Sequence, residues 1–150
     1  MLRDRWEAIC SPVVERYRTV KLASREFGEF NALAAQEKDC LERLEKKLNR
    51  SVNTAADAEE ISEELVDIEN FLRHHPEHRL PRIKELASAL TEKNILPASV
   101  VEEAEKLDAR WKDLSNKARQ RTTILEGRTL LNCLLSVVSF WCFSIRGLSL

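Results

Sequence analysis

The fold is decided by residues 100–125, VVEEAEKLDARWKDLSNKARQRTTIL. Alternating steps of four and three residues connect the members of one stripe in this stretch: Val100, Ala104, Leu107, Trp111, Leu114, Ala118, Arg121 and Leu125. In an α-helix this spacing places all of them on one side, where they pack against other helices as in a coiled coil. The stripe predicts a long helix with one polar seam residue, Arg121. We expect its guanidinium to reach acids on neighbouring helices.

A short pattern within this helix occurs twice. Leu2-Arg-Asp-Arg5-Trp6 matches Leu107-Asp-Ala-Arg110-Trp111, and further on Arg16 aligns with Arg121. Self-similarity at a fixed period is typical of modular arrays. We therefore expect three parts: the C-terminal helix of a preceding, incomplete repeat (1–22), a complete repeat (23–127) and an apolar tail (128–150).

The same spacing predicts the other helices. It can be followed from Leu2 through the N-terminal third to Leu48, with a kink or restart expected near Pro12, because proline lacks the backbone N–H that a helix needs. A polar loop is expected at 49–56, then a middle helix broken in two around Pro76 and Pro81, and a short turn at 94–96. The predicted fold is all-α, a three-helix antiparallel bundle with a core that contains Trp6, Phe30, Leu41, Leu44, Ile61, Leu65, Ile68, Leu90, Val100, Leu107, Trp111, Leu114 and Leu125.

The composition limits the possible functions. Of the 150 residues, 33% are charged and only three are glycine, which favours long solvated helices. Since the formal net charge is -1, no overall positive field would hold nucleic acid. Four scattered cysteines without a CxxC spacing indicate free thiols in a reducing compartment.

These residues resemble a spectrin repeat, a three-helix coiled coil whose last helix carries a Leu-x-x-Arg-Trp signature. Within that superfamily, Leu107-Asp-Ala-Arg-Trp-Lys-Asp-Leu114 and the break at Phe71-Leu-Arg-His-His-Pro76 are most similar to rod repeats of the dystrophin and utrophin type. The resemblance covers residues 1–127. It implies a structural module that joins others of its kind end to end.

No residues are expected to be catalytic, to bind a cofactor or to hold a metal. The chain lacks a glycine-rich phosphate loop, a nucleophile elbow and a paired metal motif. His74, His75 and His78 surround Pro76, but a polar turn explains them better than a metal site, which needs a preorganised set of donors. The seven acids within 57–69 are interpreted as a solvated helical face.

The tail differs from everything before it. Arg128 and Arg146 bracket 17 uncharged residues, a length at the lower limit for crossing a membrane. Two interpretations stay open, a membrane anchor and an apolar C-terminus without a dedicated role. The possible membrane segment consists of Leu130, Leu131, Leu134, Leu135, Val137, Val138, Phe140, Trp141, Phe143 and Ile145.

The preferred function is a non-enzymatic rod or spacer of a cytoskeletal linker of dystrophin type. By resemblance, the parent protein would couple cortical actin to a membrane complex. The expected partners are neighbouring spectrin-like repeats or proteins of the cytoskeleton and membrane complex, with actin reached only through the parent and the tail in possible contact with membrane. The expected location is the cytoplasm, at the cytoskeleton or the cytoplasmic face of the plasma membrane. The alternatives are a membrane-tethered helical adaptor and direct filament binding.

Overall fold

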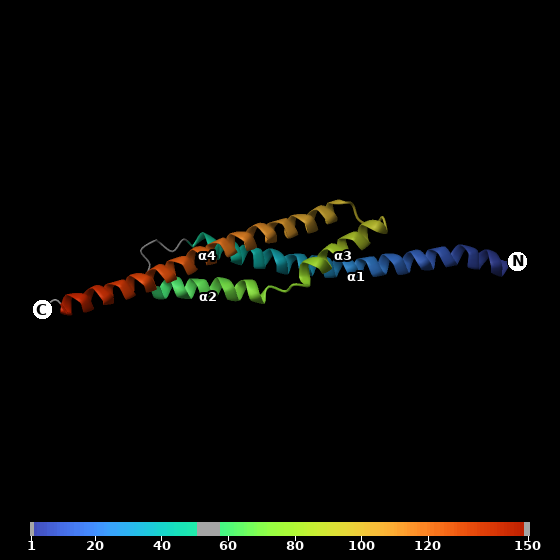
Figure 1. Cartoon of the computed structure of the whole chain (residues 1–150). Helices are drawn as coiled ribbons and strands as arrows, with labels where there is room; N and C mark the ends of the chain where they lie inside the picture. Colours follow the sequence, from blue (N-terminus) through green and yellow to red (C-terminus); the bar gives the residue numbers. More distant parts are fainter. Residues whose placement is uncertain (1, 51–57, 149–150) are drawn as a thin grey trace. The chain divides into compact units, whose positions relative to one another are not determined.

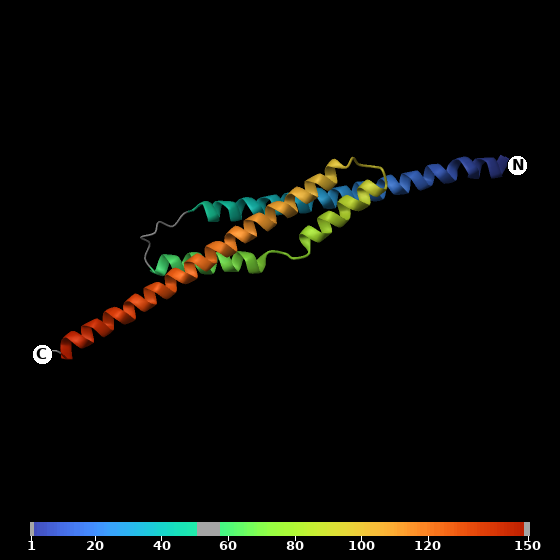
Figure 2. The same cartoon turned by 45° about the horizontal axis from the view of Figure 1, so that its top comes forward.

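A computed structural model of the chain describes residues 2–50 and 58–148. This part of the chain forms four helices and no strand: α1 (Leu2–Asn49), α2 (Ala58–His74), α3 (Arg79–Glu92) and α4 (Ser99–Leu148) (Figures 1 and 2). The all-α fold is confirmed. The predicted middle helix is indeed divided, since α2 ends at His74 and α3 begins at Arg79.

Prolines and one asparagine explain where helices are interrupted. Pro76 lies between α2 and α3, whereas Pro81 lies in the first turn of α3, where a missing N–H costs little because those groups have no partner within the helix. Asn94 adopts a φ of 54° in the turn that leads to α4, a left-handed conformation that asparagine tolerates. The turn expected at 94–96 is therefore present.

Helix α1 is continuous where a restart was expected. It contains Pro12 and has no interruption between Leu2 and Asn49, so the predicted restart is wrong, whereas the alternative of a kink stays a prediction. Removing one backbone hydrogen bond lowers the stability of a helix at that point, but the turns on either side keep theirs. The predicted loop at 49–56 lies mainly outside the described residues.

The chain forms two compact units, each built from discontinuous segments. Unit 1 contains residues 1–41 and 76–111, and unit 2 contains 42–75 and 112–150. These units differ from the predicted parts at 1–22, 23–127 and 128–150, which follow the sequence repeat and remain a prediction.

In unit 1, residues 23–41 of α1 pack with α3 and the first turns of α4. Lys93 pairs with Glu26 and Arg79 pairs with Glu37, so α1 and α3 are antiparallel. Lys38 on α1 pairs with Glu103 on α4, and Lys84 on α3 pairs with Asp108 at 2.7 Å. Each helical segment of unit 1 is thus joined to both others by an ion pair.

In unit 2, the end of α1 packs with α2 and the rest of α4. Lys47 on α1 pairs with Asp67 on α2, and Arg121 on α4 pairs with Glu64 on α2. Beyond Leu125, which is fully buried, α4 continues without a break into the tail. The tail is therefore a direct extension of a core helix of this unit.

Candidate functional site

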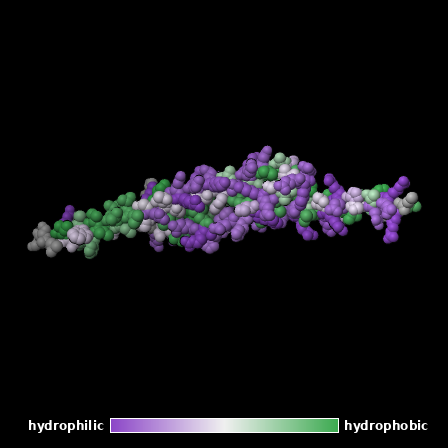
Figure 3. Space-filling view, turned by 45° about the vertical axis from the view of Figure 1, so that its right-hand side comes forward, coloured by the Kyte–Doolittle hydropathy of each residue, from purple (hydrophilic) through white to green (hydrophobic). Residues whose placement is uncertain are grey.

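The tail presents a long exposed apolar surface. All ten residues of the possible membrane segment are exposed, from 55% at Val137 to 82% at Phe143. Figure 3 shows this end as a largely hydrophobic surface, whereas most of the remaining surface in this view is hydrophilic. Among the described residues, α4 is the helix that is long and apolar enough to cross a membrane, and its apolar window is wholly unburied.

The N-terminal part of α1 presents a second apolar surface of a different kind. Leu2, Trp6, Ile9, Val13 and Val20 follow the four-three spacing and are all exposed, with charged residues between them. The expectation that Trp6 lies in a core is therefore wrong for the part of the chain that the structure describes, where 68% of this residue is exposed. The physical reason is the lack of packed neighbours on this side, since the stripe provides only one half of a helix interface.

The other predicted core residues lie mostly in the interiors of the two units. Unit 1 buries Phe30, Leu41, Leu90, Val100 and Leu107. Unit 2 buries Leu44, Ile61, Ile68, Leu114 and Leu125. Two more of them, Leu65 and Trp111, are half-buried.

A charged residue also lies in the interior of unit 1. Glu37 was predicted only to interrupt the apolar stripe of α1, but it is completely buried and accepts a hydrogen bond from Nη1 of Arg79 at 3.2 Å. Burial of a charge is costly unless a partner compensates it. The partner is 42 residues away in the sequence, so no local pattern indicates it.

A second acid on α1, Glu29, forms a bidentate ion pair with Arg82. Nε and Nη2 of Arg82 donate to the two carboxylate oxygens of Glu29 at 2.9 and 3.1 Å. These hydrogen bonds hold the pKa of the Glu29 carboxyl below 4.5. The pKa of Arg82 is raised, mainly by its hydrogen bonds to Glu29 and secondly by its hydrogen bond to Glu85. The contact fixes α3 against α1 more specifically than a single-point ion pair, because both planar groups must align.

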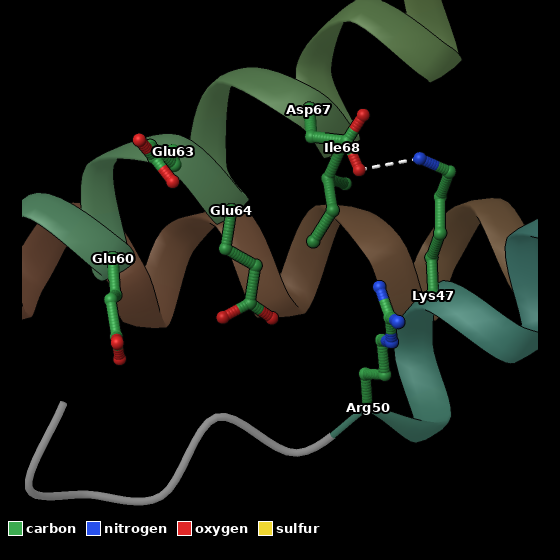
Figure 4. A pocket seen from close by; sticks show the side chains of 7 residues that line it. All are labelled: Lys47, Arg50, Glu60, Glu63, Glu64, Asp67 and Ile68. Atoms are coloured by element: carbon green, nitrogen blue, oxygen red, sulfur yellow. Dashed lines mark hydrogen bonds and ion pairs between the residues drawn. The ribbon is translucent and has the colours of Figure 1, made fainter.

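Unit 2 contains an open pocket of mixed charge, with a volume of about 390 Å³. Figure 4 shows Lys47 of α1 and Arg50, which directly follows that helix, on one side and acids of α2 on the other. Its lining residues are Lys47, Arg50, Glu60, Glu63, Glu64, Asp67 and Ile68. Two of the acids are paired within the unit, Asp67 with Lys47 and Glu64 with Arg121.

The pair at the edge of this pocket confirms the expectation for Arg121. Its Nε donates to Oε1 of Glu64 at 3.1 Å, and Nη2 donates to Oε2 at 3.4 Å. Both side chains are largely buried. The polar member of the seam therefore joins α4 to α2 within unit 2.

The three histidines around Pro76 differ in their surroundings. His75 is buried, whereas Nδ1 of His74 lies 2.7 Å from the backbone oxygen of Asn70 in the previous turn of α2. Across residues 2–50 and 58–148, no group of three histidine, cysteine or acidic side chains is placed to hold a metal ion.

A stretch of 125 residues of this chain is 34% identical to dystrophin of Drosophila melanogaster, isoforms A/C/F/G/H. The match covers 83% of the chain and agrees with the repeat pattern around Trp111 and with the helical fold. The chain is a dystrophin-like member of the spectrin-repeat superfamily. No family model matches this dystrophin-like chain, and no solved structure does so.

The dystrophin-like chain spans only 4% of the length of the Drosophila protein. Similarity over such a segment supports a structural repeat of a cytoskeletal linker, and it relates the chain to a structural protein rather than to an enzyme.

Proposed function

We propose that this dystrophin-like chain is a rod module that spaces and mechanically couples the ends of a longer cytoskeletal linker. The parent would join cortical actin to a membrane complex at the cytoplasmic face of the plasma membrane, with neighbouring spectrin-like repeats as the direct partners of this chain. The observation that carries the proposal is the 125-residue similarity to dystrophin.

The contacts within each unit suit a load-bearing role. Ion pairs and buried apolar residues join helices that are far apart in the sequence, such as Glu26 with Lys93 and Glu64 with Arg121. A force that separates these helices must expose the apolar residues between them, at about 25 cal/mol for each Å². Unfolding under load should therefore be cooperative.

Single-molecule stretching tests this proposal. With the chain held at residues 23 and 127, we expect discrete unfolding steps and refolding on relaxation. Leu125→Ala should lower the unfolding force because Leu125 is fully buried, whereas Val138→Ala in the exposed tail should leave it unchanged. Smooth extension without steps would contradict a mechanical role.

Actin cosedimentation distinguishes a spacer from a filament-binding module. A spacer that reaches actin only through its parent should stay in the supernatant at physiological salt. Saturable pelleting of the isolated chain with filaments would instead support direct binding.

The tail favours a second candidate function, that of a membrane-tethered helical adaptor. The observation behind it is the exposed apolar end of α4, which meets the length and composition of a membrane-spanning helix. In this role, unit 2 would present its charged surface to a partner, and the tail would determine location.

Carbonate extraction of membranes from cells that express the whole chain tests the tether. A tethered chain should remain in the membrane pellet, and a version that ends at Gly127 should be released. Release of both would eliminate the tether and leave the spacer as the sole candidate.

A further inference from the structure

The uncharged run of the tail has a definite length. It extends from residue 129 to residue 145, between Arg128 and Arg146, and lies wholly within α4. At about 1.5 Å per residue the run is about 26 Å long, whereas the hydrocarbon core of a typical bilayer is about 30 Å thick. A helix of this length matches a bilayer that is thinner than average.

Large apolar side chains lie on opposite sides of the run, and Asn132, Ser136 and Ser139 share the side of Phe143. With about 100° between successive residues, Leu134 and Val138 point to one side while Phe140 and Phe143 point to the opposite one. All four are exposed. A groove on a protein would cover only one side of such a helix, whereas lipid covers all of them.

Charges of both signs lie in unit 2 near the start of the tail: residues 117–128 of α4 contain four basic residues and one acid, and two of the basic ones, Lys117 and Arg121, are paired within the unit. In unit 2, α1 ends with Lys46 and Lys47 in its last turn, and α2 begins with Glu59 and Glu60 in its first turn. Attraction to anionic headgroups requires a cluster of basic residues without balancing acids. The length of the run is a property that can select a membrane independently of these charges, and zwitterionic lipid isolates it.

We propose that residues 129–145 cross a bilayer of less than average thickness, with Arg128 and Arg146 at its two opposite headgroup layers. This inference rests on the second proposed function, the membrane tether. A short span in a thick bilayer forces the bilayer to thin or the flanking arginines to reach for the interface, and the cost increases with the mismatch.

Vesicles of graded thickness test the inference. The whole chain is incubated with dimyristoleoyl-, dioleoyl- or dierucoyl-phosphatidylcholine vesicles, which differ in acyl-chain length, and the carbonate-resistant fraction is measured after flotation. We expect about tenfold more inserted chain in the thinnest bilayer than in the thickest, because each ångström of mismatch adds to the cost.

A pair of variants links the preference to the length of the run. Arg146→Leu extends the uncharged run to the last residue and should shift the maximum of insertion toward the thicker bilayers. Arg146→Lys keeps the charge and should leave the profile unchanged. Residue 146 is exposed, so both variants should retain the circular dichroism spectrum and melting curve of the original chain.

Two outcomes would overturn the inference in different ways. Equal carbonate-resistant insertion into all three bilayers, or an unchanged profile for Arg146→Leu, would refute the thickness preference and leave the tether intact. Absence of carbonate-resistant binding to every vesicle would refute the tether and the preference together.

Discussion

Trp6 and Trp111 occupy equivalent positions in two copies of one pattern, but their surroundings differ. Trp6 is largely exposed on α1, whereas Trp111 on α4 is half-buried in unit 1. The difference extends along both copies, since Val20 is exposed and its counterpart Leu125 is completely buried in unit 2. The same spacing thus forms a core in one copy and an open surface in the other.

This comparison separates what a pattern specifies from what its neighbours supply. The four-three spacing specifies an apolar side of a helix, and burial of that side requires other helices against it. Substitutions at matched positions of the two copies should therefore have unequal effects.

The largest difference is expected between Leu125→Ala and Val20→Ala. Truncation of the fully buried Leu125 removes apolar contacts and leaves a cavity, so the free energy of unfolding should fall by about 3 to 4 kcal/mol. Val20→Ala should change it by less than about 0.5 kcal/mol. Urea unfolding followed by circular dichroism measures both, and equal effects would show that the two copies are packed alike.

A smaller difference is expected at the tryptophans. Since Trp111 is only half-buried, Trp111→Ala should lower the free energy of unfolding by about 2 to 3 kcal/mol, at or below the low end of the range for aromatic truncation. Trp6→Ala should leave the melting temperature nearly unchanged. A large loss on changing Trp6 would mean that this residue contacts a core in solution.

The seam arginines provide a third test. Arg121→Ala leaves the largely buried carboxylate of Glu64 without its partner and should cost about 1 to 2 kcal/mol, whereas Arg16→Ala on the exposed stripe should cost little. A double-mutant cycle with Glu64→Ala isolates the pair. If the coupling energy between positions 121 and 64 were zero, the contact would not contribute to stability.

The smallest effect concerns an ion pair that only the second copy can form. Lys117 pairs with Asp113 at 2.8 Å, whereas the aligned positions of the first copy are Pro12 and Ala8. The hydrogen bond from Lys117 to Asp113 raises the pKa of the lysine above 10.5. Because the folded pKa is raised, the stabilisation is fully present below pH 10.5 and is lost as the pH rises through the higher folded pKa.

The measurement is the difference in melting temperature between the original chain and Asp113→Asn as a function of pH. The difference should be small, since both side chains are exposed, and should vanish at strongly alkaline pH. A difference that grows above pH 10.5 would contradict the assigned cause of the shift.

Periodicity in the sequence was sufficient to predict the helices and much of their packed sides. Val100, Leu107 and Leu114 recur at the seam spacing, and the structure buries all three. This succeeds because an apolar stripe at the helical period can be removed from water only by packing against another element. The resemblance to dystrophin-type repeats rested instead on a known family signature, Leu-x-x-Arg-Trp, which apolar periodicity alone does not identify.

Long-range pairing could not be predicted in this way. Glu37 pairs with Arg79 on another helix, and no sequence pattern around either residue indicates the other. The continuity of α1 through Pro12 was also not predicted. A proline in the sequence implies the loss of one backbone hydrogen bond, but it does not show whether the flanking turns keep the helix intact. Whether an apolar stripe is buried or exposed depends on the helices around it, and the stripe alone does not define them.

Helix α4 joins the buried Leu125 to the tail without a linker. The rotation of the tail about the helix axis therefore depends on the number of residues between them. Each residue of an α-helix adds about 100° of rotation and about 1.5 Å of rise. Insertion of one alanine between Leu125 and Arg128 would therefore turn the tail by about a quarter of a revolution relative to the seam of unit 2. Within this unit, the number of residues between Leu125 and the tail therefore fixes which way each side of the tail faces.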